Sequence, residues 1–132
     1  MMILAIDLGS SKSVYGLSEE LGGPARYGSV ATTPEAFHDL LVELSPQRVV
    51  VEVGSQAGWV KDLCDALALG CDVANTSDEM WRWNRTRLKS DKKEVDRMLF
   101  LAHSGSLPTV YMPSGAVRQW RGLIRYRHDL VQ

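Results

Sequence analysis

Apolar residues recur along the chain with two spacings, and the spacing predicts the type of each element. Residues 3–6 form an uninterrupted apolar run, which is typical of a strand buried on both faces. Short polar turns then precede residues 14–17 and 26–30, whose β-branched and aromatic side chains predict two further strands of an antiparallel meander. Two later apolar runs, 48–53 and 71–74, each follow a helical pattern and therefore predict parallel strands.

Helical spacing separates these later strands. Thr33 and Pro34 predict a helix start, because a threonine side chain caps free N–H groups and proline suits the first turn. Apolar positions three and four apart then form three stripes, namely Phe37, Leu40, Leu41 and Leu44; Trp59, Val60, Leu63, Cys64 and Leu67; and Val95, Met98, Leu99 and Ala102. This element order predicts an α/β fold of RNase H-like type, with a mixed five-stranded sheet flanked by helices.

Length and composition narrow the class of protein. A chain of 132 residues with 45% hydrophobic and 23% charged residues suits one globular domain. No apolar run reaches the roughly 18 residues of a membrane span, and no signal peptide precedes the first strand, so no membrane partner is expected. Cys64 and Cys71 lack metal-ligand spacing and are expected to be reduced thiols in a cytoplasmic, prokaryotic protein, with Cys64 in the core.

Four carboxylates are placed where they could act together. Asp7 and Glu52 each end a predicted buried strand, while Asp91 and Glu94 lie toward the apolar stripe of the helix that Ser90 caps. Four apposed carboxylates repel one another, and Mg²⁺ or Mn²⁺ would offset that repulsion. Two such ions can activate an attacking oxygen and stabilise the leaving one. The simpler alternatives are a tight turn at Asp7 and favourable helix-dipole contacts for the two helical acids.

Charge is distributed unevenly. Residues 1–80 hold 12 acidic and 4 basic residues, whereas residues 81–132 hold 4 acidic and 11 basic ones. Basic residues mixed with Trp81 and Trp83 predict a nucleic-acid face beside the carboxylates, although a solvated helix would look similar. The residues expected to contact nucleic acid are Arg82, Arg85, Arg87, Lys89, Lys92 and Lys93.

Two motifs resemble known families. Ile-Asp-Leu-Gly-Ser-Ser-Lys-Ser, residues 6–13, is similar to the first strand of RNase H-like nucleases and to the first phosphate loop of sugar kinases and actin-like ATPases, which need a much longer chain. Lys-Ser-Asp-Lys-Lys-Glu-Val-Asp-Arg-Met-Leu, residues 89–99, closely resembles the amino-terminal, RuvC-like domain of DEDD-type insertion-sequence transposases, relatives of the Piv invertases. In that family the fourth acid is an aspartate, where this chain has Glu94. Asp96, predicted to be a surface charge, is the substitute for Glu94 as fourth ligand if the helix begins late.

The resemblance also implies partners and domain organisation. It implies metal-dependent transposition chemistry on DNA, a guide RNA, a carboxyl-terminal domain with a nucleophilic serine, and oligomers formed through a coiled coil. Residues 1–106 are expected to form the catalytic domain, and 107–132 a connector and the start of a coiled-coil helix, with the serine domain missing from a truncated chain. The alternatives are a small RuvC-like Holliday-junction resolvase or ribosomal-RNA nuclease, and a module that binds nucleic acid without cutting it.

Overall fold

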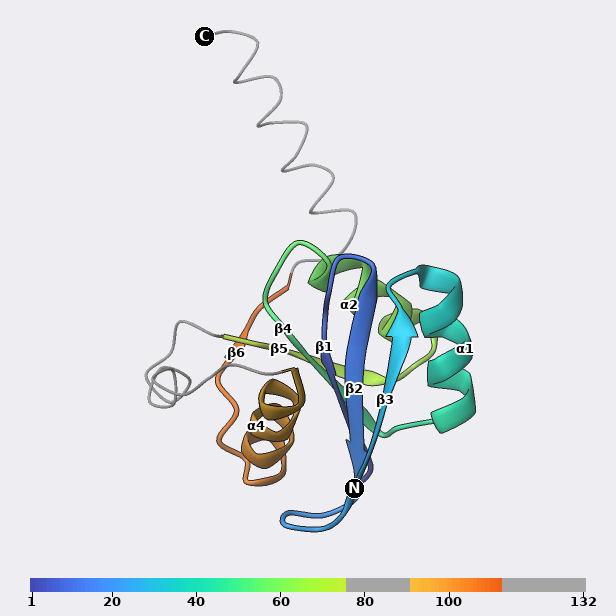
Figure 1. Ribbon diagram of the computed structural model, residues 1–132. Helices are drawn as coiled ribbons and strands as arrows, with labels where there is room; N and C mark the ends of the chain where they lie inside the picture. The colour runs from blue at the N-terminus through green and yellow to red at the C-terminus, as the bar shows by residue number, and fades with distance from the viewer. Residues whose placement is uncertain (76–90, 113–132) are drawn as a thin grey trace, which may run out of the picture.

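A six-stranded mixed sheet forms the centre of the molecule (Figure 1), as seen in a computed structural model that describes residues 1–75 and 91–112, apart from the side chain of Asp91. The strands lie in the order β3-β2-β1-β4-β5-β6. Their bounds are β1 Ile3–Asp7, β2 Lys12–Ser18, β3 Ala25–Ala31, β4 Arg48–Glu52, β5 Gly70–Ala74 and β6 Thr109–Val110. Strand β1 pairs antiparallel with β2 and parallel with β4, which confirms the predicted mixed sheet.

The sheet has one strand more than the five predicted. Strand β6 pairs antiparallel with β5, where Thr109 lies opposite Ala74 and Val110 opposite Val73. The Asn75 N–H also donates to the Pro108 carbonyl oxygen at 2.7 Å, just before the pairing begins. Two residues are too few to show an alternating pattern, so this strand can be recognised only from its partner.

Three described helices cover the two faces of the sheet: α1 Pro34–Leu44, α2 Ala57–Ala66 and α4 Asp91–His103. The predicted cap of α1 is confirmed, because Thr33 Oγ1 accepts from the Ala36 N–H at 3.2 Å with Pro34 in the first turn. The helix ends at Ser45, whose φ of 44° is left-handed and whose N–H donates to the Leu41 carbonyl oxygen. The predicted connecting helices are therefore present.

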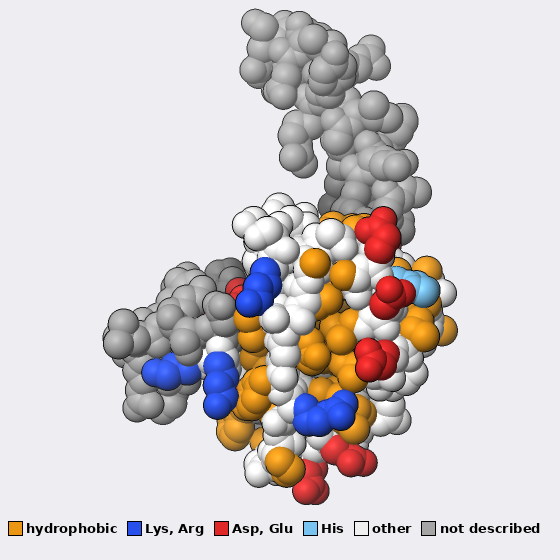
Figure 2. Space-filling model, turned by 45° about the vertical axis from the view of Figure 1, so that its right-hand side comes forward, with side chains coloured by type: hydrophobic (Ala, Val, Ile, Leu, Met, Phe, Trp, Pro, Cys, Tyr) orange, Lys and Arg blue, Asp and Glu red, His pale blue; other side chains and the backbone are white. Residues whose placement is uncertain are grey.

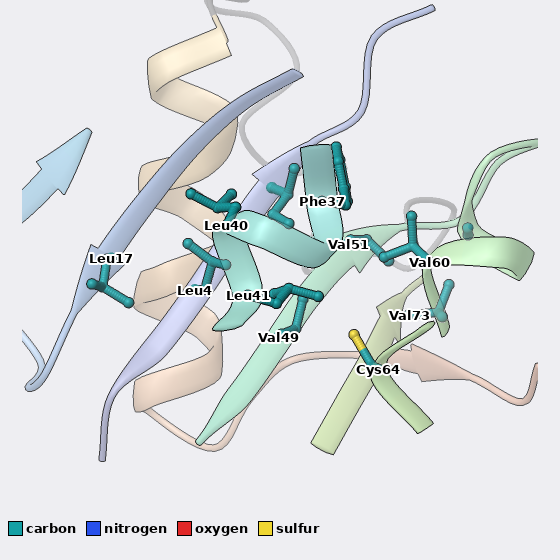
Figure 3. Packing of buried hydrophobic residues seen from close by; sticks show 12 residues of the cluster. Leu4, Leu17, Phe37, Leu40, Leu41, Val49, Val51, Val60, Cys64 and Val73 are labelled. Carbon is teal, nitrogen blue, oxygen red and sulfur yellow. The ribbon is translucent and has the colours of Figure 1, made fainter. Parts of the chain in front are cut away.

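Helices α1 and α2 cover one face of the sheet with a large apolar core. Figure 3 shows side chains from β1, β2, β4 and β5 directed toward those of the two helices. Phe37 is fully buried, and its ring meets that of Trp59 edge-on at 5.0 Å between centroids. Cys64 is also fully buried, as predicted. The buried members of this α1–α2 core are Leu4, Ile6, Leu17, Phe37, Leu40, Leu41, Val49, Val51, Ala57, Val60, Cys64 and Val73.

Helix α4 covers the opposite face through smaller residues (Figure 1). A Cβ atom added to Gly16 of β2 would lie 2.5 Å from Val95 Cγ1 and 3.3 Å from Leu99 Cδ1, so only glycine allows the helix to pack this closely. The small side chains of Ala5 on β1 and Ala74 on β5 are also buried in this layer and leave room for the helix. The buried apolar members of this α4 layer are Ile3, Ala5, Val50, Ala74, Val95, Met98, Leu99 and Leu101.

The outer surfaces of the two helical layers differ in charge. Helix α1 presents three exposed acids, Glu35, Asp39 and Glu43, and its sequence contains no lysine or arginine. In Figure 2 acidic side chains gather on the right of the view, while lysine and arginine side chains lie at its left and centre. Helix α4 carries exposed Lys92 and Lys93. Within residues 1–75 and 91–112, no helix has the length and apolar character needed to cross a membrane.

Candidate catalytic carboxylate site

Asp7 and Glu52 lie side by side at the ends of neighbouring strands. Strands β1 and β4 are parallel with Ile6 paired to Val51, so the next residue on each strand is one of the two acids. Side chains alternate between the faces of a strand, and Ala5 and Val50, two residues earlier, both belong to the α4 layer. Asp7 and Glu52 therefore project toward the α4 side of the sheet.

Helix α4 is oriented so that its first turn lies toward these acids. Near its carboxyl end, His103 Nε2 lies 2.8 Å from Ser18 Oγ, and Ser18 pairs with Ile3 at the start of β1. One to two turns earlier, Leu99 and Val95 pack over Gly16, which pairs with Ala5. The helix thus runs antiparallel to β1, and its first residue, Asp91, lies toward the end of β1 at which Asp7 stands.

Glu94 is buried in the α4 layer, as the sequence predicted from its helical position. The residue is 2% exposed, and its Oε1 accepts from Arg97 Nη1 at 3.2 Å. Its second oxygen, Oε2, is buried and has no hydrogen-bond partner among the described residues. A buried carboxylate oxygen without a hydrogen-bond partner is costly, which makes the Glu94 carboxylate a candidate ligand for a cation.

The described acids do not by themselves complete a metal site. No three carboxylate, imidazole or thiol groups in the described part of the chain lie close enough together to hold one ion. The side chain of Asp91, the remaining predicted ligand, lies outside the described residues. The structure thus places Asp7, Glu52 and Glu94 in one layer of the fold, and their joint ligation of an ion stays a prediction.

Asp96, the substitute for Glu94, faces a different partner. It is exposed, as predicted, and accepts a hydrogen bond from the Tyr27 hydroxyl of β3. That hydrogen bond, together with partial burial and the negative charge of Asp96, raises the pKa of Tyr27 to about 12. The Lys92 ammonium lies 4.8 Å from the centre of the same ring. Because β3 is two strands away from β1, this contact directs Asp96 away from Asp7.

Most of the predicted nucleic-acid contacts lie outside the described residues. Arg82, Arg85, Arg87 and Lys89 belong to that group, as does the predicted coiled-coil helix, whereas Lys92 and Lys93 are described and exposed on α4. The sequence analysis did not identify Arg97 as the partner of Glu94. The spacing of three residues between Glu94 and Arg97 is the signal that could have indicated this ion pair.

The fold resembles that of solved proteins although the sequence matches nothing closely. No protein-family model matches the chain, and no curated protein matches it. The fold is RuvC-like, within the RNase H-like class. A structure of Thermus thermophilus RuvC matches with a TM-score of 0.53 at 15% identity, covering 83% of this chain and 100% of that one. T. thermophilus RuvC in complex with a Holliday junction substrate matches with a TM-score of 0.54 at 14% identity and the same coverage.

Proposed function

We propose that this chain is the carboxylate-bearing domain of a metal-dependent enzyme that acts on DNA phosphodiester bonds, and specifically of a DEDD-type transposase. The observation that carries the proposal is that Asp7, Glu52 and buried Glu94 all lie on the α4 side of the sheet. A stable fold does not need three acids in one helix–sheet layer, because burying carboxylates costs free energy. The motif at residues 89–99 supports the transposase assignment.

The acids would hold Mg²⁺ or Mn²⁺, with Asp7, Glu52 and Asp91 as principal ligands and Glu94 as the fourth. Their oxygen atoms suit these hard cations, and the buried Glu94 Oε2 fits the same role. When bound, the ions would polarise the phosphodiester and lower the pKa of the attacking hydroxyl. The chain's own residues would hold the two strand-end carboxylates in fixed positions and neutralise part of the charge of Glu94 through Arg97.

A cleavage assay tests the chemistry. Full-length protein would be incubated with Mn²⁺ and labelled four-way or linear DNA, alongside Asp7→Asn and the control Asp39→Asn, which removes an exposed acid from α1. Nicking should fall at least about 100-fold for Asp7→Asn, because the loss of one ligand of a metal site costs that much or more. The control should keep wild-type activity. An Asp7→Asn protein that nicks as fast as the wild type would contradict the proposal.

Metal-dependent stability gives a second test that does not require cleavage. At metal concentrations 100-fold above the dissociation constant, binding should add about 2.7 kcal/mol to the free energy of unfolding of the wild type. Asp7→Asn should be more stable than the wild type without metal, because like charges no longer face each other, and should show no metal-dependent rise in melting temperature. Equal metal responses in the two proteins would argue against the ligand assignment.

A second candidate function is Holliday-junction resolution by the chain alone. The comparison with RuvC favours it, because the match spans all of a RuvC chain whose solved complex contains a Holliday junction substrate. A resolvase should nick four-way junctions without any further domain. The domain of a transposase should require the serine domain for activity. The guide RNA and the oligomeric assembly belong to this transposase proposal. Activity of residues 1–132 on junctions therefore separates the two proposals.

A further inference from the structure

The hairpin between β1 and β2 places a lysine beside the carboxylate site. Val14 of β2 pairs with Asp7, and Lys12, the first residue of β2, lies two residues before Val14. Because side chains alternate, Lys12 faces the same side of the sheet as Val14, which packs in the α4 layer. Diagonal neighbours of this kind lie about 7–8 Å apart in an antiparallel pair, so the ammonium group of Lys12 can reach a group held at Asp7.

The backbone of this hairpin is fixed by hydrogen bonds. Ser13 is fully buried, and its Oγ accepts from the Gly9 N–H at 3.3 Å and lies 2.7 Å from Thr32 Oγ1. The Thr32 N–H donates to the Ser11 carbonyl oxygen at 3.0 Å. A Cβ atom on Gly9 would lie 2.1 Å from the Lys12 carbonyl oxygen, so the turn closes tightly only with glycine. The backbone position of Lys12 at the start of β2 is therefore well defined.

The side chain of Lys12, by contrast, is available. It is exposed, and among the described residues it forms no ion pair. A cationic side chain at the edge of the carboxylate site would favour DNA binding, because Asp7, Glu52 and Glu94 repel phosphates and Arg97 already pairs with Glu94. The acid-covered surface of α1, on the opposite side, offers no such approach.

We infer that Lys12 binds the phosphate next to the scissile phosphodiester and holds the DNA backbone over Asp7 and Glu52. This inference rests on the proposed function and adds a substrate-contacting residue to the basic residues already expected between Arg82 and Lys93. Lysine suits the role because its ammonium is a compact point charge on a flexible stem. The contact carries no base specificity, so it should act on any DNA sequence.

The test is the salt dependence of DNA binding by full-length protein, with Ca²⁺ in place of Mg²⁺ and a four-way junction and a linear duplex as probes. The variants are Lys12→Gln, Lys12→Arg and the control Arg26→Gln. Arg26 is an exposed residue of β3 opposite Leu17, on the α1–α2 side of the sheet. Each substitution to glutamine removes one positive charge from the surface, so all variants should fold.

Loss of one phosphate contact makes the negative slope of log K against log salt less steep by about 0.9. Between 50 and 200 mM salt, the wild type should therefore lose about 3.5-fold more affinity than Lys12→Gln. Lys12→Arg and Arg26→Gln should keep the wild-type slope. A wild-type slope in Lys12→Gln, or the same reduced slope in Arg26→Gln, would overturn this inference and leave the proposed function standing. A wild-type protein that binds neither probe would instead overturn the proposed function itself, and this inference with it.

Discussion

The two faces of the sheet are built from different kinds of residue. On the α1–α2 side, large apolar side chains fill most of the space between sheet and helices, and the buried hydroxyl of Ser13 on this side lies 2.7 Å from Thr32 Oγ1. On the α4 side, glycine and alanine bring the helix close, and the same layer contains buried Ser18 and Glu94 with Asp7 and Glu52 at its open end. One face therefore supplies most of the stability, while the other holds polar groups in position.

This difference explains why the acids are found on one face only. Burial of apolar area contributes about 25 cal/mol per Å², and the α1–α2 core is stabilised by the large apolar side chains that it buries. A carboxylate in that core would lose its hydration without a compensating partner. In the α4 layer, Asp7 and Glu52 lie at the ends of their strands, and the buried Glu94 is paired with Arg97.

The largest effect is expected from a truncation in the α1–α2 core. Phe37→Ala should lower the free energy of unfolding by about 3–5 kcal/mol, because it removes a fully buried ring and leaves a cavity beside Trp59. Val42→Ala on the same helix removes apolar atoms from a residue that is 54% exposed, and should change stability by less than about 0.5 kcal/mol. Urea denaturation measures both. Similar losses in the two variants would show that this face is not the main apolar core.

An intermediate effect is expected where α4 packs against β2. Gly16→Ala should cost about 1–3 kcal/mol, because its new methyl group overlaps Val95 and pushes the helix away from the sheet. The matched control is Gly54→Ala, where an added Cβ would meet no atom within 4 Å. Val95→Ala in the Gly16→Ala background should recover part of the loss, and a double-mutant cycle measures that coupling. Strictly additive losses would contradict the close-packing argument.

Sequence patterns predicted the elements whose partners are local or regular. The cap at Thr33, the burial of Cys64 and the inward position of Glu94 all follow from helical periodicity, which fixes the face on which each side chain lies. The positions of Asp7 and Glu52 at strand ends follow from the apolar runs that they terminate. These features need no knowledge of distant contacts.

Contacts between distant segments could not be predicted in this way. Tyr27 and Asp96 are separated by 69 residues, and Ser18 and His103 by 85, so neither pair has a signature in the spacing of the chain. The same holds for Arg48 and Asp72, which form an ion pair at 3.0 Å across β4 and β5. Such pairs depend on the register between elements, which is set by the packing of the whole sheet.

The smallest effect is expected from the polar contact that ties α4 to β3. Tyr27→Phe removes the hydrogen bond to Asp96 and should cost less than about 1 kcal/mol, because Tyr27 is 42% exposed and solvent competes for both groups. The pKa of Tyr27 is raised to about 12 in the folded protein, so the folded state favours the neutral phenol. The stabilisation is therefore complete below pH 10, the ordinary pKa, and is lost as the pH rises toward 12.

Urea denaturation at several pH values from 7 to 11 checks this pH dependence. The stability difference between wild type and Tyr27→Phe should be constant up to about pH 9 and should shrink above pH 10. Asp96→Asn supplies the control, because an amide oxygen still accepts the hydrogen bond while the negative charge is gone, and the pKa of Tyr27 should move back toward its ordinary value. Absorbance titration of the phenol measures that pKa directly. An unchanged Tyr27 pKa in Asp96→Asn would mean that the negative charge of Asp96 is not what keeps the phenol neutral, and that the hydrogen bond and burial do so.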